Sequence, residues 1–292
     1  SRSVERLRPR ISALANELVD ALPADQPFDL LPSFATPIPL TIICELLGVP
    51  VNHANDLLAW SHAMCEMYVP QSSRKTEERA NHASAAFGAF LTAHIEEHRH
   101  NKADDLLSAL IAVRDTGEKL TDDELISTCV LLLNAGHEAT VHQTGNAVKT
   151  ILEQGGDPRR FFDRPEAAAA TVEEALRYDA PLHMFTRYAY EDIDLGPVTL
   201  KPGEQVALLL GAANRDPSAF DAPGAFRPGR PDQKNVSFGA GLHFCIGAPL
   251  ARLELQQSLS VLFSRLPELT LETAPHYRDS YHFHGLERLI VR

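Results

Sequence analysis

Apolar residues recur at intervals of three and four positions through the first 178 residues of the chain. Residues at this spacing share one side of an α-helix, so the pattern predicts helices rather than strands. Thr121, followed by three acidic residues, is the expected N-cap of the longest helix. The segments that carry the pattern are 3–22, 35–48, 54–69, 77–99, 104–114, 122–153 and 165–178.

The pattern changes after Pro181. Short alternating segments separated by Gly-Pro and Pro-Gly pairs predict strands and turns. The sequence therefore predicts a mainly α fold with small β sheets, organised as a single domain over residues 1–292. The later segments are two alternating stretches, a loop rich in proline and glycine, and a last helix, at 185–199, 204–210, 216–241 and 249–266.

Charge and hydropathy argue against nucleic acids and membranes as partners of this chain. The chain carries 27 basic and 39 acidic residues, a formal charge of −12, which disfavours nucleic acid and anionic lipid as partners. No apolar run is long enough to span a bilayer, and no signal peptide is recognisable. We therefore expect a cytoplasmic protein with no membrane contact. Because the chain begins with Ser1 rather than methionine, we also expect that sequence has been lost upstream.

The four cysteines fall into two groups. Cys44, Cys65 and Cys129 lie in apolar helical segments, where a thiol serves as a small core side chain. They are widely spaced and form no Cys-x-x-Cys pair, so a disulfide framework is not expected. Cys245 differs, because it lies among glycines directly before the last helix.

The segment 238–247, Phe-Gly-Ala-Gly-Leu-His-Phe-Cys-Ile-Gly, contains the strongest chemical signal. Glycines such as Gly239 let the backbone turn tightly and approach a flat ligand. The helix that begins near Pro249 places the positive end of its dipole beside Cys245, which favours the thiolate. A thiolate held in this way suits haem iron. A glycine-rich turn around a buried thiol is the alternative that the residues alone leave open.

Taken whole, the segment resembles the cytochrome P-450 haem-binding signature, Phe-x-x-Gly-x-His/Arg-x-Cys-x-Gly, at every position. The resemblance implies an N-terminally truncated cytochrome P-450 fold that binds haem b, with Cys245 as the axial ligand of the iron. It implies that His243 contacts a haem propionate and that Phe238 packs near the sulfur. Family members are about 100 residues longer at the N-terminus, beyond what this chain spans.

Three arginine motifs support the resemblance. Glu174 and Arg177 match the family's Glu-x-x-Arg, and Arg230 lies in a segment that resembles the one supplying a second arginine. The resemblance implies that the three form a buried network behind the haem. Arg187 matches an arginine that pairs with a propionate through its bidentate fork, although a surface arginine at a strand edge is the alternative.

The longest helical segment carries Ala-Gly-His-Glu-Ala-Thr at 135–140, which resembles the family's oxygen-activation motif. Gly136 inside a helix predicts a close approach or a bend. Ala135 or Gly136 shares a small face with Ala139, which leaves room beside the cofactor. The candidate catalytic residues are Glu138, Ala139 and Thr140.

This motif departs from the family at one position. Ala139 stands where the threonine is usual, and Thr140 is rotated away by about 100°. Protons could arrive through a substrate hydroxyl, through a longer water chain from His137 or Glu138, or through Thr140 if the helix distorts locally. We expect the substrate- or water-assisted relay, because the helical rotation directs Thr140 elsewhere.

The reaction implied by the resemblance is insertion of one oxygen atom of O2 into an unreactive C–H bond, with electrons from a ferredoxin-type donor. The candidate pocket residues are apolar, so a lipophilic organic substrate is expected. They are Leu132, Ala135, Ala139, Leu182, Phe185 and Phe283.

The sequence also leaves two other interpretations open. The first is an imperfectly folded, inactive fragment of such an enzyme. The second is a zinc metallopeptidase, because His94, Glu97 and His98 fit the pattern His-x-x-Glu-His on one helix. A solvated helix face would explain the same residues without any metal.

Overall fold

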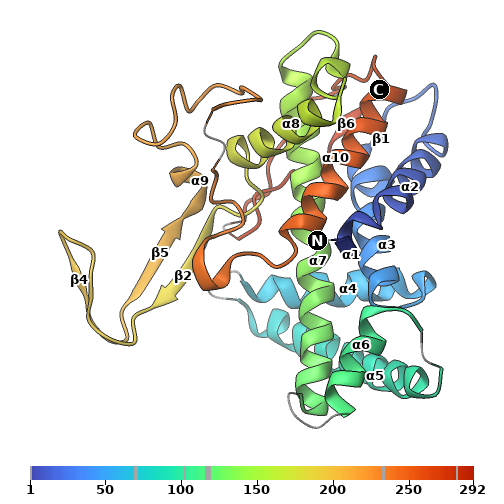
Figure 1. Ribbon diagram of the computed structural model, residues 1–292, viewed down its shortest axis with the longest axis vertical. Helices are drawn as coiled ribbons and strands as arrows, with labels where there is room; N and C mark the ends of the chain where they lie inside the picture. Colours follow the sequence, from blue (N-terminus) through green and yellow to red (C-terminus); the bar gives the residue numbers. More distant parts are fainter. Residues whose placement is uncertain (1, 69–71, 102, 116–119, 232–233, 281) are drawn as a thin grey trace. The chain divides into compact units, whose positions relative to one another are not determined.

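The computed structural model describes residues 2–68, 72–101, 103–115, 120–231, 234–280 and 282–292 (Figure 1). It divides into two compact units, residues 1–141 and 142–292, which are described separately below. The boundary falls within α7 (Asp122–Glu153). The single domain expected from the sequence remains a prediction.

Among its described residues, the first unit is helical apart from a two-residue strand. A π-helical turn at Leu31–Ala35 precedes α3, and 3-10 turns precede and follow α4. The predicted 54–69 helix ends earlier, at Cys65, and its last residue lies outside the described ones. The elements are α1 (Arg2–Glu5), α2 (Arg8–Asp20), β1 (Phe28–Asp29), α3 (Pro37–Leu46), α4 (Ala54–Cys65), α5 (Arg74–His100), α6 (Leu106–Asp115) and the start of α7.

The predicted cap of α7 is present. The backbone N–H of Glu124 donates to Thr121 Oγ1 over 3.2 Å, and the Glu124 carboxylate accepts from the Thr121 backbone N–H over 2.8 Å. This reciprocal capping box satisfies donors that the first turn of a helix otherwise leaves unpaired. It explains why the helix begins at Asp122, as the sequence predicts.

The core of the first unit forms where α4 and α5 pack together. Phe87 and Leu91 of α5 are fully buried, and the ring of Trp60 lies 5.5 Å from that of Phe87. Cys44 and Cys129 are buried in the same cluster, as predicted for small core side chains, whereas Cys65 is only half-buried. Burial of the periodic apolar faces holds these helices together.

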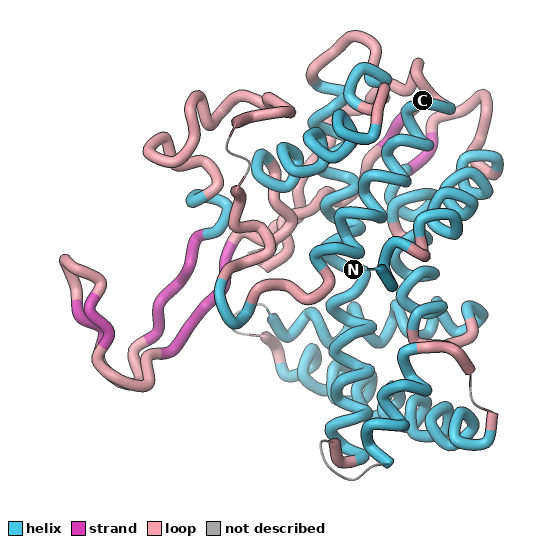
Figure 2. The backbone as a smooth tube through the Cα atoms, viewed as in Figure 1, coloured by secondary structure: helices cyan, strands magenta, loops and turns pink. Residues whose placement is uncertain are grey.

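The second unit combines two packed helices with a long β-ribbon (Figure 2). In the ribbon β2 pairs antiparallel with β5, Met184 opposite Leu209, and β3 pairs with β4 at its tip. The predicted strand 204–210 ends at Leu209, because Leu210 opens a short helix. The elements are the end of α7, α8 (Pro165–Tyr178), β2 (Met184–Tyr188), β3 (Ile193–Asp194), β4 (Thr199–Leu200), β5 (Gln205–Leu209), α9 (Leu210–Ala213), α10 (Ala248–Arg265) and β6 (Ile290–Val291).

Helices α8 and α10 pack against one another and form the core of the second unit. The rings of Phe162 and Phe263 stack with centroids 5.4 Å apart, and Val172 of α8 and Leu259 of α10 are fully buried. The connection from α9 to α10 is largely irregular, as predicted for 216–241, with residues 232–233 outside the described ones. This loop leads to Cys245.

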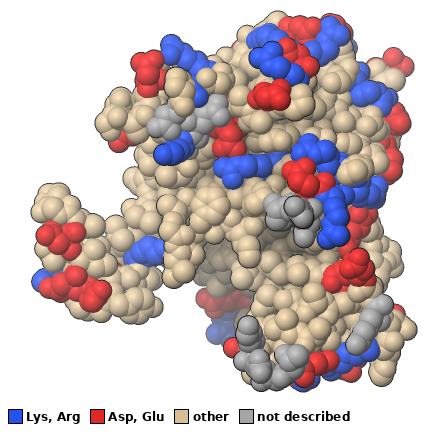
Figure 3. Space-filling model, in the orientation of Figure 1, with Lys and Arg blue, Asp and Glu red and all other residues tan. Residues whose placement is uncertain are grey.

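The surface carries both signs of charge. On the face drawn in Figure 3, basic side chains alternate with acidic ones and form no continuous basic patch. The tip of the β-ribbon is acidic, with Glu191, Asp192 and Asp194 exposed and Lys201 bonded to Asp192 over 2.6 Å. Of the helices described, none is both long and apolar enough to cross a membrane.

Glu254 of α10 is a buried carboxyl that the sequence pattern does not reveal. Its Oε1 makes no hydrogen bond among the described residues, and burial raises its pKa to about 8. The folded protein therefore holds this proton up to a higher pH than the unfolded chain does. Stability is consequently lost as the pH rises from the unfolded pKa of about 4.5 towards 8.

We predict that Glu254→Gln removes this pH dependence, because glutamine resembles the protonated acid. Below pH 5 the two proteins should unfold at similar urea concentrations. Above pH 8 the variant should be the more stable, by up to roughly 5 kcal/mol. Urea unfolding of both proteins across this pH range measures the difference. Parallel stability curves for the two proteins would show that the carboxyl is not protonated in the fold.

Candidate functional site

Glu174 of α8 is enclosed by two arginines. Arg177 donates from Nε and Nη2 to the two carboxylate oxygens, each over 2.8 Å, and Arg230 donates from Nε over 3.0 Å. The backbone N–H of Arg227 adds a further bond of 2.7 Å. Glu174 and Arg177 are each only 2% exposed. The predicted buried network of Glu174, Arg177 and Arg230 is therefore confirmed, and its place behind the haem remains a prediction.

The arginines also bind backbone carbonyls of the irregular loop. Arg177 Nη1 donates to the carbonyls of Asn214 and Pro223 over 2.9 and 3.0 Å. Arg230 Nη2 donates to the carbonyl of Ala225 over 2.7 Å. Each guanidinium thus binds a buried carboxylate and backbone carbonyls together, which compensates the cost of burying its charge.

Asn214 extends the network to the start of the cysteine loop. Its side-chain amide donates to Ser237 Oγ over 2.8 Å, and its Oδ1 accepts from the backbone N–H of Val236 over 2.8 Å. Ser237 Oγ in turn donates to the carbonyl of Leu176 in α8 over 2.7 Å. The backbone at residues 236–237 is thereby fixed against α8, directly before Phe238.

The cysteine loop is a tight turn that ends at α10. Gly239 and Gly241 have φ of +70° and +65°, a backbone conformation that glycine adopts without strain. The Cys245 N–H donates to the carbonyl of Phe238 over 2.9 Å and closes the loop. Cys245 therefore stands three residues before Ala248, the first residue of α10. The positive end of the α10 dipole therefore lies beside the thiol.

The surroundings of Cys245 fit a flat apolar ligand. Leu242 and Ile246, on either side of it in sequence, are 96% and 89% exposed, and the thiol itself is half-buried. His243 is exposed, and so is Arg187 of β2, which donates from Nη1 to the carbonyl of Thr186 over 2.8 Å. Haem requires a ligand for its iron, apolar contacts for its ring and hydrogen-bond donors for its propionates, and Cys245, Leu242 with Ile246, and His243 with Arg187 are side chains of these three kinds.

Phe238 is held by cation–π and ion-pair contacts. The Arg252 guanidinium lies 4.6 Å from its ring centroid, and Arg252 Nη2 donates to the Glu173 carboxylate over 3.1 Å. The ring is thus positioned by α8 and α10, the two helices that also frame the loop. The predicted packing of Phe238 near an iron-bound sulfur remains a prediction.

The other three cysteines are poor iron ligands. Burial raises the pKa values of Cys44, Cys65 and Cys129 to about 11, so each remains a neutral thiol at physiological pH. Iron binds the thiolate rather than the thiol. The chemistry of the donor set therefore favours Cys245.

The face of small residues predicted for α7 is at least partly accessible to solvent. Ala135 is exposed and Leu132 and Ala139 are half-buried, whereas Glu138 and Thr140 are buried. Thr140 thus points away from the face that carries Ala139, as the helical rotation predicts. The helix continues without interruption through these residues, so no local opening redirects Thr140.

Gly136 marks a close approach, as the sequence predicts. A Cβ at this position would lie 2.8 Å from Cγ1 of Ile43 in α3. Glycine therefore lets α7 approach α3 more closely than alanine would.

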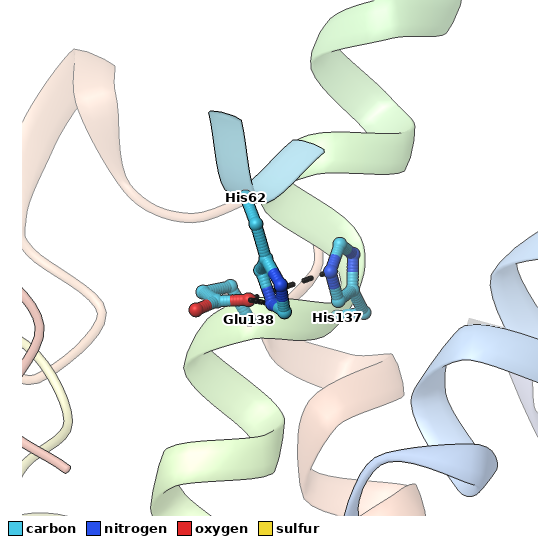
Figure 4. A group of neighbouring side chains, drawn as sticks. All are labelled: His62, His137 and Glu138. Atoms are coloured by element: carbon cyan, nitrogen blue, oxygen red, sulfur yellow. Dashed lines mark hydrogen bonds and ion pairs between the residues drawn. The ribbon is translucent and has the colours of Figure 1, made fainter. Parts of the chain in front are cut away.

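His62 of α4 joins the buried end of the α7 motif, a contact that sequence reasoning missed. Its Nε2 lies 3.1 Å from Glu138 Oε2, and His137 Nε2 lies 3.5 Å from the same oxygen (Figure 4). The His62 side chain is 49% exposed, whereas the other two are buried. A histidine more than seventy positions away, in a helix with ordinary periodicity, gives no local signal of this contact.

Three of the residues predicted to line the substrate pocket, Leu182, Phe185 and Phe283, belong to the second unit. Leu182 forms a β-bridge with Phe283, and Phe185 follows in β2. Phe185 also packs edge-on against His282, with ring centroids 5.8 Å apart. All three candidates are half-buried apolar side chains.

The metallopeptidase pattern in α5 forms no metal site. His94 Nε2 bonds the carbonyl of Gly48 over 2.9 Å, and His98 Nε2 bonds Asp105 Oδ2 over 3.0 Å. Both imidazoles are buried, whereas Glu97 is exposed. The three side chains therefore do not converge on one ion. The solvated helix face expected as the alternative is also wrong, because the histidines attach α5 to its neighbours.

Asp179, His183 and His284 form a second cluster of potential metal ligands in the second unit. The Asp179 carboxylate already accepts from Tyr277 Oη over 2.5 Å and contacts His284 Nε2 over 3.0 Å. The rings of His183 and His284 stack with centroids 3.9 Å apart. Stacked rings direct their lone pairs side by side rather than towards a common point, so the arrangement suits packing better than metal binding.

Comparison with known sequences identifies one family. The family model described as Cytochrome P-450 matches residues 166–279. Cytochrome P-450 107B1 of Saccharopolyspora erythraea is 38% identical over 296 residues, covering 100% of this chain and 71% of that protein. The 6-deoxyerythronolide B hydroxylase of the same organism is 37% identical, covering 100% of this chain and 72% of that protein.

Solved structures agree. A crystal structure of the cytochrome P-450 BioI, in complex with an acyl carrier protein ligated to hexadec-9Z-enoic acid, superposes with a TM-score of 0.93. It is 36% identical in sequence, and the match covers 100% of this chain and 75% of that one. The mainly helical fold with small sheets is thus shared with these enzymes.

We predict that Glu174→Gln destabilises the protein by about 3–5 kcal/mol, because it leaves two buried guanidinium groups without their carboxylate. Glu173→Gln is the matched control on the same helix, since its partner Arg252 is partly exposed. That change should cost about 1 kcal/mol or less. Thermal and urea unfolding measure both. Equal costs for the two variants would contradict a structural role specific to Glu174.

Proposed function

This chain belongs to the cytochrome P-450 family of monooxygenases, and we propose that it is a cytoplasmic haem-thiolate enzyme that inserts one oxygen atom of O2 into a lipophilic organic substrate. The observation that carries the proposal is the cysteine loop. Cys245 lies at the positive end of α10, in a turn fixed through Asn214 and Ser237 to the buried Glu174 network.

Haem b, when bound, supplies the oxygen chemistry, and the protein supplies ligation, orientation and exclusion of water. Cys245 is the proposed axial ligand, and Gly239 leaves its backbone open to a flat ring. His243 and Arg187, both exposed, are proposed to bind the propionates. Ala135 and Gly136 are proposed to face the cofactor, since small residues leave space for O2 and substrate.

The geometry of α7 supports a specific proton path. The reaction consumes protons, and a relay requires groups within hydrogen-bond reach of one another. His62 is half-exposed and lies 3.1 Å from the buried Glu138 carboxylate. We infer that His62 takes protons from solvent and passes them to Glu138. Ala139 has no donor, so water or a substrate hydroxyl would complete the path.

The substrate class is proposed from the apolar character of the candidates Leu132, Leu182, Phe185 and Phe283. The relatives support a lipophilic substrate in different ways. One is named a hydroxylase of 6-deoxyerythronolide B, and another was crystallised with a carrier protein bearing a fatty acid. A ferredoxin-type protein is the proposed electron donor.

We predict that Cys245→Ser abolishes the absorption band, in reduced protein treated with carbon monoxide, from which the family takes its name. Serine offers no thiolate to the iron. Cys44→Ser, Cys65→Ser and Cys129→Ser should keep the band, because those thiols are neutral and their role is packing. Loss of the band in one of these three variants, with haem retained, would overturn the assignment of Cys245.

We predict that Ala139→Thr changes coupling little. If water or substrate already completes the proton path, the product formed per reducing equivalent should be high in the native protein. An added hydroxyl should then not raise it much. The measurement is product and hydrogen peroxide per reducing equivalent, with a substrate that turns over. A native enzyme that leaks peroxide, and is corrected by threonine, would show instead that Ala139 is a defect.

A further inference from the structure

His137 is oriented as metal-binding histidines are. Its Nδ1 bonds the carbonyl of Leu133, one turn earlier in α7, over 2.8 Å. A carbonyl only accepts hydrogen bonds, so Nδ1 carries a proton, and in the neutral imidazole Nε2 presents a lone pair. Metal-bound histidines characteristically donate their second ring nitrogen in this way.

The lone pair of His137 is buried without a hydrogen bond. The residue is 1% exposed, and its Nε2 has no hydrogen-bond partner among the described residues. It lies 3.5 Å from Glu138 Oε2, which is an acceptor as well. Two acceptors facing each other in a buried place repel unless a proton or a metal ion lies between them.

We propose that His62, His137 and Glu138 form a binding site for a divalent transition metal with the chemistry of Zn²⁺. Two imidazoles and one carboxylate are a ligand set that zinc takes in proteins. The site lies entirely within the first unit, and the three side chains converge from α4 and α7 (Figure 4). Nothing in the cysteine loop takes part in it.

The distances are close to those that a zinc ion requires. The three ligand atoms lie within 4.8 Å of one another, and two of the separations are 3.1 and 3.5 Å. Tetrahedral zinc with bonds of about 2.0–2.1 Å places its ligand atoms about 3.3 Å apart. Small rotations of the side chains would therefore complete the site. The half-exposed His62 provides the entry path.

The set contains nitrogen and oxygen but no sulfur. Cys65 of α4 is the nearby thiol, and burial, followed by the charge of Glu138, raises its pKa to about 11. A neutral thiol is not a metal ligand. The cluster of Asp179, His183 and His284 is the competing site in this chain, and its stacked rings make it the weaker one.

The metal would compete with protons for the same atoms. Metal binding requires deprotonated ligands, so an ion at this site takes up Glu138 and His62 together. In so far as the proposed function is correct, micromolar Zn²⁺ should then inhibit turnover by blocking the proton path. The binding itself does not depend on that function.

The test is zinc binding by the full haem-loaded chain after treatment with a chelator. Equilibrium dialysis and elemental analysis should find one tightly held zinc per chain. Zinc X-ray absorption should show only nitrogen and oxygen ligands at about 2.0–2.1 Å, and no sulfur at about 2.3 Å. A sulfur ligand, or no zinc held at micromolar concentration, would overturn the proposal.

Variants locate the site. His62→Ala, at a half-exposed position, and Glu138→Gln, which keeps the side chain's size, should each weaken zinc binding by about 100-fold with helical content unchanged. His53→Ala removes a half-buried histidine beside α4 and is the matched control; it should bind zinc normally. Retention of the tight zinc in His62→Ala, or its loss in His284→Ala, would show that the metal binds elsewhere and refute the assignment.

Discussion

The buried carboxylate of Glu174 is the interaction on which the second unit depends. It accepts hydrogen bonds from Arg177, Arg230 and the Arg227 backbone, and the same arginines bind loop carbonyls. An irregular loop has few backbone partners of its own, so these charged groups take the place that a sheet or helix would otherwise fill. These contacts also fix the position of the cysteine loop. Hydrogen bonds of Asn214 and Ser237 extend the Glu174 network to the residue before Phe238.

Local pattern predicts much of this molecule. The bounds of α7 and α8 agree with the predicted 122–153 and 165–178, because periodicity, a capping box and a proline define them within a few residues. Glu174, Arg177 and Arg230 are found from motifs, since their spacing resembles that of a known family. The opposite orientations of Ala139 and Thr140 follow from helical geometry alone.

Contacts between distant segments could not be predicted in the same way. His62 meets Glu138 because α4 packs beside α7, and neither helix shows this in its own sequence. His94 and His98 lie in a segment rich in charged residues, which is typical of a solvated helix face. Both histidines are nevertheless buried in the fold, where they bond Gly48 and Asp105. Glu254 lies among ordinary helix-forming residues of α10, and only the fold removes its carboxyl from water. Side chains that look alike in sequence thus acquire different chemistry from burial.

The Glu174 network also bears on the order in which the chain folds. Arg177 lies three residues from Glu174 and meets it as soon as α8 forms, whereas Arg230 lies 56 residues later. Until the segment with Arg230 has formed, the Glu174 carboxylate and the Arg177 guanidinium remain hydrated. Burying these two charged groups before all their hydrogen bonds are made would be energetically costly. Contacts of such long sequence separation form slowly, since a long loop must close first. During synthesis on the ribosome, Glu174 and Arg177 of α8 would therefore stay exposed to solvent until residues 214–237 have emerged. The cysteine loop would adopt its final conformation only then.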